Sequence, residues 1–373
     1  MKLTAEQLGS LETPCLVIDM AQVRRNIAQM QQAADQAHCA LRPHIKTHKM
    51  PLFAQMQVAA GAQGITCAKV SEAEVMADGG LADIFIAYPM VGAPRVARAL
   101  ALNRRVQRLI LAVDSLPGAA ALNAAAQAAD EVLEVRLEID TGAGRTGVPI
   151  EGAVSLAREI ASMSHLRLTG IYTFKSLVLN GEPTTDNERA AQEEGRIMAE
   201  VAKAICAAGI PLQDISAGST PTGAAVARTG LVTEIRPGTY IFKDLLLCGE
   251  NVAQPEEIAV RYVATVVSTP HEEYAVIDGG TKTFPTDIQP GTAPALANGF
   301  AVVEGHPELA LSRMNEEHGI LTAKSGHTGL KVGDILTLLP VHVCTAINQQ
   351  NKVYLLENGT LRQQKVEARG MLV

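Results

Sequence analysis

Residues 108–140 read RLILAVDSLPGAAALNAAAQAADEVLEVRLEID, and this stretch decides the fold. It begins with the apolar run 108–114 and ends with 133–140, in which every second residue is aliphatic, and both segments are typical of strands. The Ala- and Leu-rich segment between them has the spacing of a helix. A strand, a helix and a second strand in this order predict a parallel pair joined by a helical crossover.

The same alternation extends in both directions from this stretch, with helical segments such as 93–103 and 186–208. Six further segments are predicted to be strands: 41–46, 64–69, 83–89, 167–174, 213–218 and 233–242. Eight strands within about 200 residues are the number and length expected for a (β/α)8 barrel. We therefore expect a TIM-type barrel over residues 21–245.

The pattern changes after residue 245. Val- and Thr-rich runs separated by Gly and Pro turns predict a mainly antiparallel β domain: 258–268, 273–278, 300–304, 334–339 and 352–356. A strand expected at 14–19 precedes the barrel pattern, and we assign it to the same domain. The second domain is therefore expected to combine residues 1–20 with residues 246–373.

The composition excludes several classes of protein. The 373 residues carry 32 basic and 39 acidic side chains, a net charge of −7, which lacks the basic excess of a nucleic-acid-binding surface. Hydrophobic residues make up 47% of the chain, but no run reaches the ~20 apolar residues of a membrane helix. The six cysteines include no C-x-x-C pair and indicate reduced thiols. We expect a soluble, cytoplasmic protein that binds neither nucleic acid nor membrane.

In a (β/α)8 barrel the active site is formed at the carboxyl ends of the strands. The first strand ends in RPHIKTHK (42–49), which contains Lys46. Desolvation and neighbouring cations would lower the pKa of the Lys46 amine and suit it for Schiff-base chemistry. Lys49 is interpreted as an ordinary loop charge.

Two Gly-rich segments follow the last two strands, where TIM-type barrels often bind phosphate. Gly218, Ser219 and Thr220 follow the seventh strand, and Gly238 and Thr239 follow the eighth. Their backbone N–H groups and hydroxyls are suitable hydrogen-bond donors. Either segment alone is typical of a turn, but together they favour phosphate binding.

A third Gly-rich segment, DTGAGRTG (140–147), follows the fifth strand. Its GxGxxG spacing matches a dinucleotide-binding loop, but that loop follows the first strand of a Rossmann unit. We reject the dinucleotide interpretation and expect Arg145 to contact an anion or a cofactor.

The β domain contains a candidate metal pair, His342 and Cys344. In an extended strand, side chains at i and i+2 share one face, so both could reach one ion. An imidazole and a thiolate suit Zn²⁺. An isolated H-x-C sequence more often marks packed strand residues, so the metal interpretation needs further support.

Six motifs occur in order along the chain: TPCLVID (13–19), RPHIKTHK (42–49), DTGAGRTGV (140–148), EIRPGTYIFKD (234–244), EEHG (316–319) and HVC (342–344). With them, from residue 13 to Asn348, the chain resembles the D-serine dehydratase/D-threonine aldolase family, which has the alanine racemase fold. The resemblance implies pyridoxal 5′-phosphate (PLP) and a divalent metal as cofactors, and a homodimer as the assembly.

The resemblance also implies roles for single residues. Lys46 would bear PLP as a Schiff base, and Arg145 would contact the phenolic oxygen of the cofactor. His342 and Cys344 would bind the metal. Phosphate contacts are implied for Ser219, Gly238 and Thr239, and further cofactor contacts for Tyr172 and Tyr240.

Cys344 also bears on the metal and on the reaction. The resemblance associates H-x-C with zinc and D-serine dehydratases, and H-x-D with manganese or magnesium and with aldolases. We therefore expect zinc, with manganese or magnesium as alternatives. The chain departs from the family near the substrate: it has Phe174 and Lys175 where relatives often have a histidine, and Val341 where they tend to have asparagine.

The expected reaction is cleavage of a D-3-hydroxy amino acid. We favour β-elimination to a 2-oxo acid and ammonia, with retro-aldol cleavage to glycine and an aldehyde as the alternative. An amino-acid racemase is a third possibility, although no tyrosine of the β domain lies in a recognisable racemase motif. The additional β domain argues against a PLP-carrier protein, which would be a bare barrel.

Overall fold

The computed structural model describes residues 1–295 and 297–373. They form two compact units. Unit 1 comprises Met1–Ile27, Thr47–Lys49 and Thr239–Gly370, and unit 2 comprises Ala28–Lys46, Met50–Gly238 and Met371–Val373. The sequence predicts domain boundaries after residues 20 and 245. In the structure, the main boundaries between the two units lie after Ile27 and Gly238.

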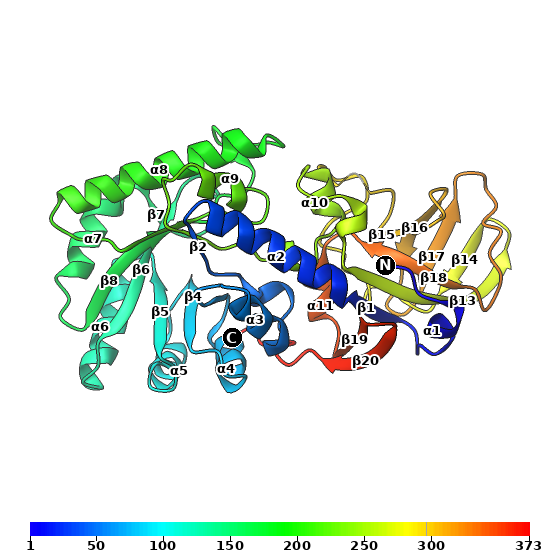
Figure 1. The fold of residues 1–373 in the computed structure, drawn as a ribbon, viewed down its shortest axis with the longest axis horizontal. Helices are drawn as coiled ribbons and strands as arrows, with labels where there is room; N and C mark the ends of the chain where they lie inside the picture. Colours follow the sequence, from blue (N-terminus) through cyan, green and yellow to red (C-terminus); the bar gives the residue numbers. More distant parts are fainter. Residues whose placement is uncertain (296) are drawn as a thin grey trace. The chain divides into compact units, whose positions relative to one another are not determined.

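Unit 2 contains a parallel β/α barrel (Figure 1). Its strands are β2 (Ala40–Leu41), β3 (Ile65–Cys67), β4 (Asp83–Pro89), β5 (Arg108–Val113), β6 (Leu133–Asp140), β7 (Val148–Pro149), β8 (Leu166–Tyr172), β11 (Asp214–Ala217) and β12 (Glu234–Ile235). Eight of them pair in the order β2-β12-β11-β8-β6-β5-β4-β3, and β7 pairs with β6. After β2, the N–H of Thr66 donates to Pro43 at 2.8 Å and His44 bridges to Thr66, which closes the ring. The predicted eight-stranded barrel is confirmed.

Helices surround these strands in Figure 1. They are α3 (Pro51–Ala59), α4 (Val70–Asp78), α5 (Ala93–Asn103), α6 (Leu116–Ala128), α7 (Ala153–Ala161), α8 (Asn187–Ala207) and α9 (Gly223–Arg228). Both α5 and α6 have proline in the first turn, where its fixed φ favours a helix start. Helix α5 buries Val96, Ala99 and Leu102, whose spacing of three residues places them on one face. The helices expected at 93–103 and 186–208 correspond to α5 and α8.

The inside of the barrel is charged. Glu134, Arg136 and Glu138 alternate along β6 and are all buried, so they share the inward face. Arg136 donates to Glu234 of β12 at 2.6 Å, and Arg42 donates to the same carboxylate at 2.7 Å. Both arginines and Glu234 are 0% exposed. The barrel interior is therefore held by paired charges as well as by aliphatic packing.

Unit 1 is a mainly antiparallel β domain (Figure 1). Its strands are β1 (Cys15–Asp19), β13 (Val260–His271), β14 (Tyr274–Ile277), β15 (Ala301–Val303), β16 (Leu309–Met314), β17 (Gly319–Ala323), β18 (Ile335–Pro340), β19 (Lys352–Glu357) and β20 (Thr360–Lys365). They pair in the order β16-β17-β14-β13-β1-β19-β20, and β18 joins β13 to β15. Strand β1 pairs with β13 and, in parallel, with β19, so it is part of this sheet.

The sequence prediction missed β16, β17 and β20. Strand β20 reads TLRQQK and lacks the apolar residues that mark a strand in a sequence. Strands β16 and β17 flank the EEHG motif, whose exposed Glu316, Glu317 and His318 form the turn between them. Glu317 pairs with Lys282 there, at 2.6 Å. The motif is therefore the turn of a β hairpin.

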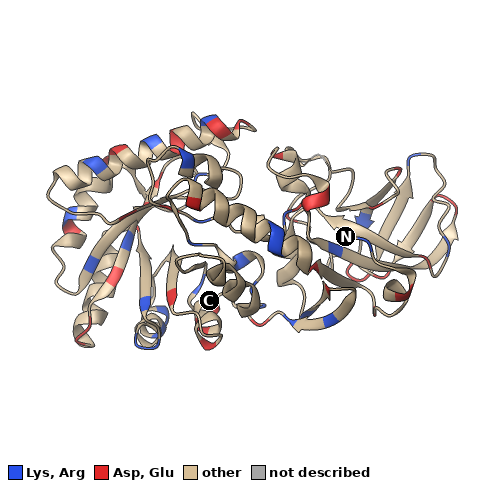
Figure 2. Ribbon diagram, in the orientation of Figure 1, with Lys and Arg blue, Asp and Glu red and all other residues tan. Residues whose placement is uncertain are grey.

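The other α-helices are α2 (Met20–Gln36), which is long and divided between the units, and the short helices α1 (Ala5–Gly9), α10 (Leu245–Gly249) and α11 (Val343–Asn348). None of the helices described in residues 1–295 and 297–373 is long and apolar enough to cross a membrane. Lys and Arg residues are interspersed with Asp and Glu residues on both units (Figure 2).

Candidate functional site

Lys46 lies five residues after the end of the first barrel strand, β2, in the short 3-10 helix η1 (Ile45–Thr47). The Lys46 backbone N–H lies 3.3 Å from Nδ1 of His44. Its half-buried side chain extends to the end of β8, where Nζ lies 5.6 Å from the centroid of the Phe174 ring. The predicted Schiff-base lysine is thus at a strand end, beside an aromatic ring.

Arg145 lies in the loop after β6, and its Cζ lies 4.5 Å from the centroid of the same Phe174 ring. The ends of β2, β6 and β8 therefore bring the amine of Lys46 and the guanidinium of Arg145 to one aromatic side chain. Lys46 and Arg145, which were expected to contact the aldehyde and the phenolic oxygen of the cofactor, therefore lie beside the same aromatic ring.

The glycines of this loop are explained by its backbone. Gly142, Gly144 and Gly147 have φ values of +123°, +62° and +104°, which side chains disfavour. The Asp140 carboxylate accepts from the N–H groups of Gly142 and Gly144 at 2.9 and 3.2 Å. A Cβ at Gly147 would lie 2.6 Å from the backbone nitrogen of Asp140. The GxGxxG pattern thus holds Arg145 in a tight turn.

Glu138 connects this loop to Tyr172, and sequence reasoning missed it. Its Oε2 accepts from the Tyr172 hydroxyl and its Oε1 from the Thr146 hydroxyl, both at 2.8 Å. Burial raises the pKa of Glu138, and the two hydrogen bonds only partly oppose it. Burial and the neighbouring Glu138 raise the pKa of Tyr172, which keeps its phenol protonated. Buried Tyr172 is therefore fixed as a donor to Glu138.

The two predicted phosphate segments meet because β11 and β12 are paired neighbours. The N–H of Gly238 donates to the Thr220 hydroxyl at 3.2 Å. The N–H of Ser219 donates to the Thr222 hydroxyl, also at 3.2 Å. Hydroxyls and backbone N–H groups are thus gathered at two adjacent strand ends.

Glu194 of α8 orders the first of these segments. This buried carboxylate accepts from the N–H of Gly218 at 3.1 Å and from the Thr222 hydroxyl at 3.0 Å. Burial raises the pKa of Glu194, and these hydrogen bonds oppose the rise. Helix α8 therefore holds the 218–222 loop in place through Glu194.

The donors of unit 2 fit PLP group by group. An amine suits the aldehyde, a guanidinium suits the phenolic oxygen, and N–H and hydroxyl donors suit the phosphate. The remaining predicted contacts, Thr239 and Tyr240, belong to unit 1, in the 3-10 helix η3 (Thr239–Ile241). Tyr240 is buried there.

Lys175, which lies where relatives often have a histidine, forms a buried ion pair. Its side chain is 1% exposed, and its Nζ lies 2.7 Å from Oε1 of Glu193 on α8. The other Glu193 oxygen accepts from the N–H of Asn180 at 2.9 Å. The ion pair therefore holds the 173–186 segment, including the hairpin of β9 (Val178–Leu179) and β10 (Glu182–Pro183), to the helix.

In unit 1, His342 and Cys344 do not share a strand face, so that part of the prediction is wrong. Strand β18 ends at Pro340, His342 is the N-cap of α11, and Cys344 lies in the first helical turn. The two side chains nevertheless meet through a hydrogen bond, because the chain turns from strand to helix between them.

The pair has further polar contacts within unit 1. Nδ1 of His342 lies 2.5 Å from Oδ2 of Asp287. Sγ of Cys344 lies 3.1 Å from the Thr47 hydroxyl and 3.5 Å from the Thr239 hydroxyl. Burial lowers the pKa of His342, but the hydrogen bonds to Asp287 and Cys344 outweigh burial and raise it to about 11.

His342 and Cys344 would supply part of the ligand set of a divalent metal. An imidazole and a thiol in contact are a nitrogen and sulfur ligand pair of the kind that zinc prefers. Apart from residue 296, which is not described, no group of three or more His, Cys, Asp or Glu side chains is arranged to hold an ion. The protein would thus supply two ligands from this pair and leave other positions to water or substrate.

Family models match both parts of the chain. The alanine racemase N-terminal domain matches residues 18–245, and the putative serine dehydratase domain matches residues 259–356. D-threo-3-hydroxyaspartate dehydratase from Delftia sp. is 36% identical over 91% of this chain and 92% of the relative. D-threonine aldolase from Arthrobacter sp. is 30% identical over 98% of this chain and 94% of the relative.

Solved structures agree with this result. The Delftia dehydratase has a TM-score of 0.87 at 34% identity, with 96% of this chain and 98% of that chain covered. A Cys-to-Ala mutant of the same dehydratase, solved in the metal-free form, also has a TM-score of 0.87, at 34% identity over 96% of this chain and 98% of that chain. The chain therefore belongs to the D-serine dehydratase/D-threonine aldolase family with the alanine racemase fold.

Proposed function

We propose that this protein is a PLP- and metal-dependent lyase that dehydrates a D-3-hydroxy amino acid to a 2-oxo acid and ammonia. The observation that carries the proposal is the position of Lys46 and Arg145, 5.6 and 4.5 Å from the centroid of the Phe174 ring. An amine for the aldehyde and a guanidinium for the phenolic oxygen are the two groups that reactive PLP needs.

Bound PLP supplies an electron sink for the bond broken at the α-carbon, and a bound metal supplies Lewis acidity toward the β-hydroxyl. Lys46 would hold the cofactor aldehyde through Nζ, and its amine, when free, would be the base for the α-proton. Arg145 would donate to the phenolic oxygen and stabilise its ionised form.

The other cofactor contacts proposed are Tyr172, Ser219, Gly238, Thr239 and Tyr240. The gathering of N–H and hydroxyl donors at the ends of β11 and β12 supports a phosphate site at Ser219 and Gly238. The hydrogen bond from the Tyr172 hydroxyl to Glu138 fixes the Tyr172 ring, which supports a role for this ring in orienting the cofactor.

We propose zinc as the metal, bound by His342 and Cys344. The contact between imidazole and thiol supports this choice, because a thiolate favours zinc over manganese and magnesium, which prefer oxygen ligands. The metal-free form of the related dehydratase, obtained with a cysteine mutant, is consistent with a cysteine ligand.

The test is product analysis with the purified holoenzyme supplied with PLP and zinc. D-Serine and D-threonine should each yield a 2-oxo acid and ammonia in equal amounts, and their L-enantiomers should not react. Addition of a chelator should stop the reaction. No turnover of either D-amino acid with metal present would reject both as substrates.

Retro-aldol cleavage is the second candidate, favoured by the 30% identity to a D-threonine aldolase. The same residues would serve, but the products would be glycine and an aldehyde. Racemisation is the third candidate and is supported by a likeness of fold alone, since an alanine racemase matches with 14% identity.

We further propose that the protein is a homodimer, as the family resemblance implies. Sedimentation equilibrium would test this proposal.

A further inference from the structure

We propose that Asp287 is a positioning residue for the metal: its carboxylate fixes the His342 ring so that Nε2 is the nitrogen that binds the ion. This inference rests on the proposed function in one respect, that His342 and Cys344 bind a metal. Asp287 is not itself a ligand in this proposal, because its carboxylate is bound to Nδ1.

The contacts of Asp287 converge on one oxygen. Oδ2 lies 2.5 Å from Nδ1 of His342, and the hydroxyl of Thr345 donates to the same oxygen at 3.1 Å. Thr345 follows Cys344 in α11, so one carboxylate connects the N-cap of this helix to its first turn.

A second carboxylate near α11 has a different role. Asp244 is 0% exposed and accepts from the backbone N–H groups of Leu247 and Val343, at 3.0 Å each. It therefore holds the backbone of α10 and α11 together. Asp287 is the carboxylate that holds the imidazole.

The hydrogen bond determines the tautomer of His342. A carboxylate oxygen accepts a hydrogen bond from Nδ1, so an N–H is held there, and the proton that the ring gives up when a metal binds is the one at Nε2. Nε2 then has the lone pair that a metal needs, and the ring cannot turn away without losing the bond. Such carboxylate partners typically change metal affinity by about 10- to 100-fold.

The experiment measures zinc affinity of the PLP-loaded protein by competition with a chelator of known affinity. Asp287→Ala should weaken zinc binding by about 10- to 100-fold, and Asp287→Asn, which keeps a neutral acceptor, by less. The visible absorption of bound PLP should stay at the wild-type value, because Asp287 is not among the proposed cofactor contacts, and circular dichroism should show that the zinc-free variants are folded.

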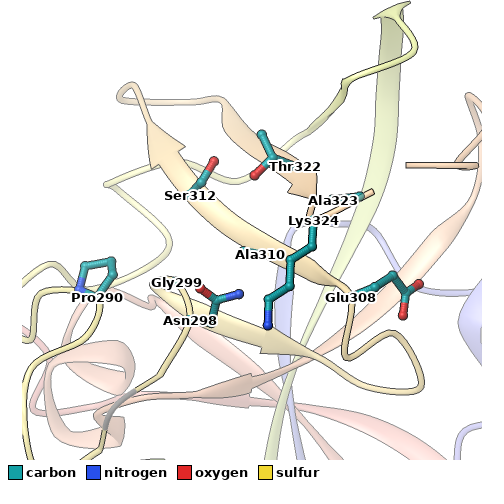
Figure 3. A pocket seen from close by; sticks show the side chains of 9 residues that line it. All are labelled: Pro290, Asn298, Gly299, Glu308, Ala310, Ser312, Thr322, Ala323 and Lys324. Atoms are coloured by element: carbon teal, nitrogen blue, oxygen red, sulfur yellow. The ribbon is translucent and has the colours of Figure 1, made fainter. Parts of the chain in front are cut away.

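Glu308→Gln is the matched control. Glu308 forms the same kind of bond in the same unit, 3.1 Å from Nδ1 of His306, and both side chains are exposed. It borders a shallow pocket of about 250 Å³ that also includes Asn298 and Lys324 (Figure 3). Because His306 is not a proposed ligand, this substitution should leave zinc affinity unchanged.

Two results would overturn the inference, and they can be told apart. If the wild-type protein binds zinc and Asp287→Ala binds it equally well, the positioning role is wrong while the proposed metal site stands. If the wild-type protein itself binds no divalent metal, both the inference and the metal part of the proposed function fail.

Discussion

The contact between Arg145 and Phe174 gives a quantitative prediction for cofactor binding. Phe174→Leu keeps apolar bulk at the end of β8 but removes the aromatic face that the guanidinium lies over at 4.5 Å. A cation–π contact at an exposed arginine contributes about 0.5–1 kcal/mol. If this contact positions Arg145 for PLP, the loss corresponds to about two- to fivefold weaker PLP binding. Lys46 adds little, because its Nζ is 5.6 Å away, near the limit of such contacts.

The assay is a double-mutant cycle with Arg145→Ala. Apoprotein of the wild type, both single variants and the double variant is titrated with PLP, and binding is followed by the absorption of the bound cofactor. Phe174→Leu should weaken binding in the wild-type background and have no further effect once Arg145 is absent. An equal effect of Phe174→Leu in both backgrounds would refute the reasoning. Unchanged unfolding midpoints would confirm that each variant is folded.

Three further predictions concern the lysine, the thiol and the barrel interior. Lys46→Ala should lose the visible absorption of lysine-bound PLP and all ammonia release; retention of both would mean that PLP attaches elsewhere. Cys344→Ala should keep that absorption but lose zinc, by elemental analysis, and lyase activity, whereas full wild-type activity after chelation would contradict the metal role. Glu234→Gln should lower the free energy of unfolding by about 3 kcal/mol in urea titrations, the lower end for a broken buried pair because each arginine keeps another carboxylate. Burial would raise the pKa of Glu234, but Arg136 and Arg42 outweigh it and lower the value. Its contribution is therefore complete above the unfolded pKa of 4.5 and is lost as the pH falls below it, so acid should destabilise the wild type more steeply than Glu234→Gln.

The barrel could be predicted because its signals are local. A buried parallel strand such as β5 is a nearly continuous run of aliphatic residues, and a helix such as α5 shows its apolar spacing within eleven residues. The strand ends follow directly from these elements, and with them the positions of Lys46, Arg145 and Ser219.

Contacts distant in sequence could not be predicted in the same way. Glu138 and Tyr172 are 34 positions apart, and Asp287 and His342 are 55 apart, without a shared local pattern. One signal was present for the first: charged residues at 134, 136 and 138 alternate within an otherwise aliphatic strand, which indicates a charged inward face.

The predicted backbone of the candidate metal pair, His342 and Cys344, was wrong for a related reason. The sequence LLPVHVCTAIN has apolar residues on both sides of Pro340, so the apolar pattern alone does not show where β18 ends and α11 begins. Strand and helix both bring His342 near Cys344, so the proximity of the two side chains could be predicted although their backbone was misassigned.

The most direct test of the proposed dehydration is one product ratio. The PLP- and zinc-loaded protein is given D-threo-3-hydroxyaspartate, and ammonia and glycine are quantified in the same sample. Elimination predicts one ammonia for each substrate consumed, with oxaloacetate as the other product and no glycine. Glycine and glyoxylate in equal amounts, without ammonia, would contradict dehydration and identify retro-aldol cleavage instead.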